Sequence, residues 1–393
     1  MSDNPIDTKT PSQEVLEFNA QLQKDLDLDK RKKQVQEKDL FIREHKVGNE
    51  YENIVRNKDE IERAPTINFG AISNEAIERM VVENEDYILA ARNPLPFIND
   101  DFRGIVPFFR NNLILIGSKT GGGKSTTVAN ITYKLLKTKN KITKRPHRIL
   151  LLSNEEKNTD VYNRITCLLK GTAYVNHSDF TDQQMKEFSD YIRLLGKSGK
   201  LTVIEDRHEG ISGWTTTPEG ISLIFDNLIK NNEIYDVVII DYYQNINASK
   251  VDPSLVAWQV QEKFANEMDR IKLKYPGAIV VMAMMDPLKD EDDTTPYKLR
   301  INGRKSICDK ATFIGEIVPE PKQLRSKWTV WKSRWTTSIG DEFYSGYDRG
   351  MLVPYSLEFQ KSTAKIVERN LERAKEQELG INEEKKEEEN DPQ

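Results

Sequence analysis

Short apolar runs alternate with longer amphipathic stretches from about residue 94 onward. The apolar runs predict strands at Leu113–Ile116, Arg148–Ser153, Leu201–Ile204, Val237–Ile240 and Ala278–Met282. The stretches between them predict helices at Ser125–Leu136, Asp160–Leu169, Asp182–Leu195, Pro218–Asn231 and Val256–Leu273. Apolar strands joined by helices are typical of a parallel sheet covered on both faces. The sequence therefore predicts an α/β fold with a mostly parallel central sheet flanked by helices. Later apolar positions predict antiparallel strands at its C-terminal edge, at Thr329–Trp331, Glu342–Phe343 and Leu352–Val353.

The two ends of the chain are rich in charge. Residues 1–93 predict a helical arm, in which Thr10-Pro11-Ser12-Gln13 has the form of a capping box and a second helix covers Asn74–Ala91. The apolar stripe of this arm is too narrow for a core of its own, so the arm is either solvated or packed on a neighbouring subunit. Residues 94–356 are expected to form the α/β domain. Residues 357–393 predict a charged helix that ends near Glu378 and then an acidic, disordered tail.

Composition and charge narrow the classes of function. The chain has 393 residues and a formal net charge of −5, so no overall positive field draws it to nucleic acid or to membrane. A nucleic-acid contact would come from a local patch or from a ring of subunits that present the same loop. The two cysteines, Cys167 and Cys308, favour a reducing setting without disulfides or a zinc site. No apolar run approaches the ~18 residues of a membrane span, and we expect a soluble, cytoplasmic protein.

A glycine-rich turn follows the first predicted strand and opens a helix. It contains Gly121, Gly122, Gly123, Lys124, Ser125 and Thr126, with Ser118 where a phosphate loop usually has its first glycine. Glycines let the backbone wrap an anion, and the unpaired N–H groups at the helix start point at it. Lys124 would bind the terminal phosphates, and the Ser125 hydroxyl would hold Mg²⁺. This pattern predicts a site for ATP and Mg²⁺; the alternative is a flexible turn closed by a surface lysine.

Carboxylates follow two of the predicted strands. Asp241 ends the run Val237–Ile240, which is where a carboxylate would orient Mg²⁺ beside Ser125. Glu155 and Glu156 follow the second strand, and Glu155 is our candidate for the base that activates water. Glu156 fits the other interpretation, a solvated glutamate at a strand end.

Two groups of cations are candidates for anion binding. Lys332 and Arg334 are two apart on a predicted strand and would point to one side, toward a γ-phosphate of the next subunit. The alternative is a solvated strand face. Loops 245–253 and 286–305 are candidates for binding a polynucleotide. The second loop carries the cations Lys298, Arg300, Arg304 and Lys305, which suffice for weak, sequence-independent binding to phosphates. The alternative is an ordinary surface loop.

Taken in order, these motifs resemble the RecA-like motor domain of the DnaB-type replicative DNA helicases, in a viral version. The resemblance covers residues 95–356 and includes Ser153-Asn154-Glu155-Glu156, Arg164, Ile240-Asp241-Tyr242-Tyr243-Gln244 and Lys332-Ser333-Arg334. It implies that Glu155 is the catalytic base, that Arg164 lies at the nucleotide, and that Lys332 and Arg334 reach the neighbour's ATP. It further implies a hexameric ring that hydrolyses ATP and moves 5′ to 3′ on single-stranded DNA during replication. A primase or a helicase loader would be a partner, and the host cytoplasm would be the location.

Two departures from this family leave other functions open. The family carries Ser-Gln where this chain has Met284-Met285, and the N-terminal helical domain of the bacterial enzymes is replaced by the 1–93 arm. One alternative is a RecA- or KaiC-like ATPase that remodels DNA or protein without unwinding. Another is a nucleotide-gated loading or assembly factor with negligible hydrolysis.

Overall fold

The computed structural model of the chain describes residues 74–99, 102, 105–172, 181–206, 213–286, 295–335, 337, 339–348 and 350–389. The predicted arm helix opened by Thr10 and the last residues of the acidic tail lie outside this part. Residues up to Asp86 and residues from Tyr87 onward belong to two compact units, so the unit boundary falls within α2 (Asn74–Arg92). The predicted domain boundaries at 93/94 and 356/357 stay predictions.

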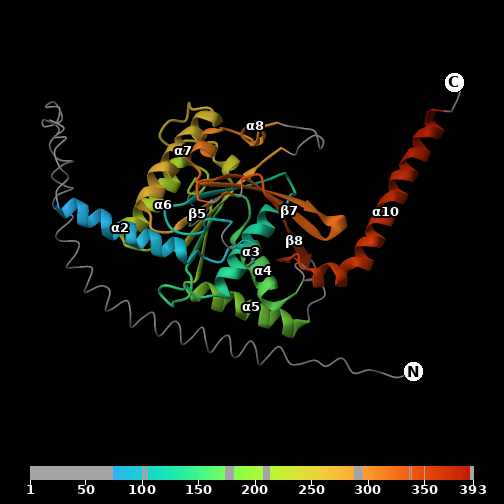
Figure 1. Cartoon of the computed structure of the whole chain (residues 1–393), viewed down its shortest axis with the longest axis horizontal. Coiled ribbons are helices and arrows are strands. Elements are labelled where there is room, and N and C mark those ends of the chain that lie inside the picture. The colour runs from blue at the N-terminus through green and yellow to red at the C-terminus, as the bar shows by residue number, and fades with distance from the viewer. Residues whose placement is uncertain are drawn as a thin grey trace. The chain divides into compact units, whose positions relative to one another are not determined.

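A nine-stranded sheet forms the centre of the second unit (Figure 1). Its order is β3 (Leu201–Glu205), β2 (Ile149–Ser153), β4 (Val237–Asp241), β5 (Ala278–Met284), β1 (Leu113–Ser118), β6 (Phe313–Glu320), β7 (Arg325–Ser333), β8 (Glu342–Asp348) and β9 (Met351–Pro354). The strands from β3 to β6 pair in parallel, and those from β6 to β9 pair antiparallel. The predicted fold class, a mostly parallel sheet with an antiparallel C-terminal edge, is confirmed. Strand β6 was not predicted, because its mixed polar sequence and Pro319 lack the continuous apolar run of a buried strand.

Helices cover both faces of the sheet. One face carries α3 (Lys124–Leu136), α4 (Asn158–Lys170) and α5 (Asp182–Lys197), and the other carries α6 (Pro218–Lys230) and α7 (Ala257–Lys274) (Figure 1). The short α9 (Ser306–Lys310) packs into the same core as α6 and α7. Along β1, Ile114 and Ile116 pack into the first core, whereas Leu113 and Leu115 pack into the second. Successive side chains of a strand point to opposite faces, so a strand covered on both sides must be apolar at every position.

The last helix, α10 (Leu357–Glu389), continues past the end predicted for it at Glu378. Its sequence there is rich in glutamate and lysine, which are good helix formers even without an apolar face. The short helix α8 (Tyr297–Arg300) follows β5. Among the described helices, none combines the length and the apolar character needed to cross a membrane.

Candidate nucleotide site

The glycine-rich turn between β1 and α3 forms a closed loop at the carboxyl end of the central strand. Gly121 and Gly123 have φ values of 68° and 88°, a left-handed conformation that glycine adopts without strain. Ser118, at the position of the missing first glycine, is fully buried, and its hydroxyl donates to the Gly122 carbonyl oxygen at 2.6 Å. A Cβ at Gly122 would overlap that hydroxyl oxygen. The serine therefore closes the loop with its side chain, and only glycine fits opposite it.

Lys124 and Ser125 open α3 directly after this loop. The Lys124 side chain is largely buried, and its Nζ lies 5.2 Å from the centroid of the Tyr242 ring. A lysine buried in this way cannot swing freely into solvent. The N–H groups of the first turn of α3 have no earlier helical partners, so the loop and the helix start together form an anion cradle.

Asp241 lies next to this cradle, at the end of β4. The parallel register pairs Ser153 with Asp241, so the ends of β2 and β4 lie side by side. The Asp241 side chain is 5% exposed, and its Oδ1 has no hydrogen-bond partner among the residues that the structure describes. Burial, and then the nearby charges of Glu156 and Glu155, raise the pKa of Asp241 to about 7. A buried carboxylate with a free oxygen beside a serine hydroxyl fits a divalent cation, which would supply the missing positive charge.

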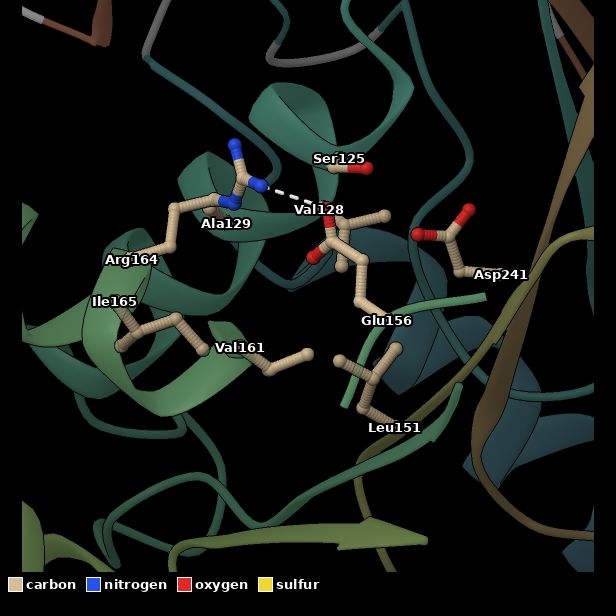
Figure 2. A pocket seen from close by; sticks show the side chains of 9 residues that line it. All are labelled: Ser125, Val128, Ala129, Leu151, Glu156, Val161, Arg164, Ile165 and Asp241. Carbon is tan, nitrogen blue, oxygen red and sulfur yellow. Dashed lines mark hydrogen bonds and ion pairs between the residues drawn. The ribbon is translucent and has the colours of Figure 1, made fainter. Parts of the chain in front are cut away.

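Figure 2 shows the small pocket between the start of α3 and the end of β2. Its polar lining consists of Ser125, Glu156, Arg164 and Asp241, and its apolar lining of Val128, Ala129, Leu151, Val161 and Ile165. Arg164 forms an ion pair with Glu156, with 2.6 Å between the guanidinium nitrogen and the carboxylate oxygen. The structure thus brings Ser125, Arg164 and Asp241 together. It also places Glu156 in the pocket, although the sequence had suggested a solvated glutamate at that position. Glu155, the predicted base, is exposed.

Asn154 joins the two strand ends and was missed as a functional residue. Its side-chain oxygen accepts a hydrogen bond from the Tyr242 N–H at 2.6 Å, and its side-chain nitrogen donates to the Tyr242 carbonyl at 2.8 Å. Its own N–H donates to the Asp241 carbonyl at 2.9 Å. The amide therefore fixes the position of Glu155 relative to Asp241. The only sequence signal for Asn154 is its place between the polar residues Ser153 and Glu155, directly after an apolar strand.

Lys332 lies on β7, whereas Arg334 directly follows the last residue of this strand, so only the first of the two predicted cations is on the strand. Both lie against the C-terminal end of α9. Lys332 Nζ donates to the carbonyls of Cys308 and Asp309 at 2.7 and 3.1 Å, and Arg334 donates to the Asp309 carbonyl at 3.3 Å. Both side chains thus point to one side. Burial, and then the charge of Arg334, lower the pKa of Lys332. Among the described residues, neither cation lines the pocket of Figure 2, so their contact with a phosphate in another subunit stays a prediction.

The predicted DNA-binding residues around α8 are all engaged within the chain. Lys298 pairs with Asp309, Arg304 pairs with Glu262, and Lys305 donates to the Ile301 carbonyl. Lys298 and Arg304 have half-exposed side chains that can turn to a phosphate. Arg300, in contrast, is 3% exposed and forms two hydrogen bonds to Glu316. Its guanidinium would have to leave that carboxylate to contact DNA directly.

The loop after β4 is anchored by Glu219 at the start of α6. Glu219 accepts hydrogen bonds from the Ser249 hydroxyl and from Lys263 Nζ, both at 2.6 Å. Burial works against the charged form, but the hydrogen bonds from Lys263 and Ser249 outweigh it and lower the pKa of Glu219 to about 2. This candidate polynucleotide loop is therefore held on the body of the domain.

Solved structures support the fold, whereas no family model and no curated protein match the chain. Among solved structures, an ATPase domain is 12% identical with a TM-score of 0.55, over 72% of this chain and 100% of that one. A DnaB-like replicative helicase, described together with its interactions with primase, is 12% identical with a TM-score of 0.55, over 77% of this chain and 73% of that one. A KaiC-like protein from Pyrococcus horikoshii OT3 matches at a TM-score of 0.40 and 13% identity, over 63% of this chain and 90% of that one, which is too low to carry an argument. The fold is RecA-like, as the sequence predicted; at this identity the likeness says nothing more.

Proposed function

We propose that this chain is the motor of a ring-shaped, ATP-dependent DNA helicase that moves along single-stranded DNA during replication. The observation that supports it most is the unpaired, buried Asp241 carboxylate beside the Ser118-closed phosphate loop, on the fold of DnaB-like helicase ATPase domains. A hexamer, 5′ to 3′ movement, a primase or loader as partner, a viral origin and a location in the host cytoplasm are parts of this proposal that rest on the resemblance alone.

In this proposal the phosphate loop binds the triphosphate of ATP. Lys124 and the first N–H groups of α3 bind its terminal phosphates, and Ser125 and Asp241 hold Mg²⁺. When bound, Mg²⁺ neutralises charge that develops on the phosphate oxygens. A water oxygen attacks the γ-phosphorus, its proton passes to Glu155, and the bond from that phosphorus to the bridging oxygen of ADP breaks. Arg164 holds Glu156 in an ion pair at the pocket wall, so that Glu155 is the carboxylate that accepts the proton.

Lys332 and Arg334 supply the remaining positive charge in a ring of identical subunits. They lie outside the pocket of their own chain, which suits a role at the γ-phosphate of a neighbour. Positive charge placed there in advance stabilises the transition state. Each active centre is then shared by two copies of the chain.

Strand displacement tests this function. We expect the purified protein with ATP and Mg²⁺ to separate a forked duplex that has a free 5′ single-stranded tail, and to leave it intact with a non-hydrolysable ATP analogue or with EDTA. A blunt duplex is the control, because a ring needs a single strand to thread. ATP turnover without any displaced strand would contradict the helicase and favour the remodelling ATPase.

One observation favours that remodelling ATPase as the second candidate. Met285, in place of the family's glutamine, is 1% exposed, and its Sδ lies 2.7 Å from the site of a Cβ at Gly117. This side chain packs on β1, and its thioether has no hydrogen-bond donor to offer a nucleotide, unlike a glutamine amide. If the chain couples ATP to DNA, another connection has to do so. The nucleotide-gated loading factor predicts ATP binding without phosphate release.

Replacing Glu155 with glutamine tests the assigned base. We expect turnover to fall about 10²-fold with ATP affinity retained, because glutamine keeps the shape but cannot accept the proton. Phosphate release and binding of a fluorescent ATP analogue measure the two effects. The matched control is Glu156→Gln, which breaks the pair with Arg164 and should change KM more than kcat. The opposite result, loss of kcat only in Glu156→Gln, would move the base to Glu156.

A further inference from the structure

A buried ionic cluster joins the segment after β5 to the strand β7. It consists of Arg300, Glu316 and Trp331, of which Arg300 and Glu316 are 3% and 4% exposed. The Arg300 guanidinium donates to both oxygens of Glu316, at 2.8 and 2.6 Å. The Trp331 indole N–H donates to the second of these oxygens at 2.8 Å. Three donors therefore converge on one nearly buried carboxylate, which makes the geometry of the cluster strict.

Two aromatic rings, those of Trp331 and Tyr297, pack at this cluster. The guanidinium carbon of Arg300 lies 5.1 Å from the Trp331 ring centroid, and the Tyr297 ring stacks on Trp331 at 6.0 Å and 20°. Arg300 Nε has no hydrogen-bond partner among the described residues. Burying an ion pair costs desolvation free energy, and the unpaired Nε–H adds to that cost, so the pair contributes little to stability. Its strict geometry is better suited to holding two segments in one defined arrangement.

On one side, the cluster holds the base of the loop after β5. Arg300 also donates to the Asp286 carbonyl at 3.2 Å, while the Asp286 N–H donates to the Arg300 carbonyl at 2.7 Å. The two ends of the loop are thus joined at Arg300. Lys298 and Arg304, the half-exposed cations proposed for DNA, lie on the same short segment.

On the other side, the cluster ends beside the proposed trans-acting cations. Trp331 immediately precedes Lys332 on β7, and Glu316 lies on β6 next to it. A second connection runs from Lys298 through its ion pair with Asp309, whose carbonyl accepts hydrogen bonds from Lys332 and Arg334. A shift of the segment 297–305, or a turn of Lys298 toward a phosphate, would therefore change the contacts of Asp309, to which both cations are bound.

We infer that Glu316 and Trp331 are positioning residues that transmit DNA engagement at the segment 297–305 to Lys332 and Arg334, and so to the ATP that those cations reach. The inference rests on the proposed function and names the residues that would couple DNA binding to ATP in it. The connection runs through Glu316 on β6 and Trp331 on β7 and does not use Met285, which follows β5 and has its side chain buried against β1. A purely structural cluster would stabilise the fold but leave the affinities for DNA and ATP independent of each other.

The test measures this mutual dependence. A fluorescent oligothymidine is titrated with the protein in the presence and absence of a non-hydrolysable ATP analogue, and the analogue is titrated with and without DNA. In the parent we expect each ligand to change the affinity for the other by the same factor, about fivefold or more. In Trp331→Phe, which keeps the ring and loses the indole N–H, we expect that factor to fall below about twofold. Glu316→Gln should behave alike, and thermal unfolding checks that each variant is folded.

Trp328→Phe is the matched control. Trp328 lies on the same strand and donates its indole N–H to the Ser345 hydroxyl at 3.0 Å, outside the cluster. The same substitution there should lower the melting temperature at least as much and leave the coupling factor at the parent value. Coupling in Trp331→Phe and Glu316→Gln equal to the parent's would overturn the inference and leave the proposed function standing. A parent without any coupling would overturn the proposed function and the inference together.

Discussion

Replacing Arg334 with alanine is expected to lower ATP turnover about 10³-fold, because the variant removes a positive charge that the transition state of the neighbour's ATP needs. The residue lies outside the pocket of its own chain and is held at the Asp309 carbonyl at the end of α9. ATP binding should change little, since most phosphate contacts come from the loop of the other subunit. Steady-state phosphate release and the dissociation constant for an ATP analogue give the two numbers.

Lys327→Ala is the control for this prediction. Lys327 is another cation of β7, and its ion pair with Glu342 at 2.6 Å belongs to the antiparallel edge of the sheet. Its loss should leave turnover within about twofold of the parent, as is usual for a surface ion pair. An Arg334→Ala variant that hydrolyses ATP like the parent would rule out catalysis across the subunit interface.

Replacing Lys124 with alanine is expected to reduce both ATP turnover and ATP binding. The lysine is largely buried at the start of α3, directly after the glycine-rich loop. Its removal should reduce turnover about 10³-fold and weaken ATP binding as well, because it contacts the phosphates both before and during the reaction. Isothermal titration with ATP and Mg²⁺ and a phosphate-release assay measure both effects.

The matched control is Lys119→Ala. Lys119 lies in the same loop but is exposed, so its loss should have little effect on either quantity. If Lys119→Ala were inactive and Lys124→Ala active, the loop would bind its anion in another way than proposed.

Much of the fold could be predicted because buried strands impose a strong pattern. The parallel strands β2, β4 and β5 each carry a continuous apolar run, such as Val237–Ile240, and the polar residue after the run marks the carboxyl edge of the sheet. Asp241 and Ser153 could therefore be placed at that edge from the sequence, and the register confirms that they are neighbours. Strand β6 was missed because it has no such pattern.

The details of the site could not be predicted, because spacing does not give the direction of a side chain. Glu155 and Glu156 are adjacent in sequence, and the backbone turn after β2 sends Glu156 to Arg164 in the pocket. Arg300 is a cation in a polar loop, yet it is buried by its pair with Glu316 on a strand that follows later. The bonds of Asn154 to Tyr242 likewise depend on two strands meeting, which no local pattern contains.

We propose that adjacent copies of the chain share each active centre, a claim that a mixture of two inactive variants can decide. Lys124→Ala subunits lack a working phosphate loop but keep Arg334, whereas Arg334→Ala subunits have the reverse defect. If the centres are shared, an equal mixture should regain ATP turnover, because about a quarter of the interfaces in a randomly mixed ring pair an intact loop with an intact Arg334. Turnover of the mixture no greater than the mean of the two separate variants would contradict the claim.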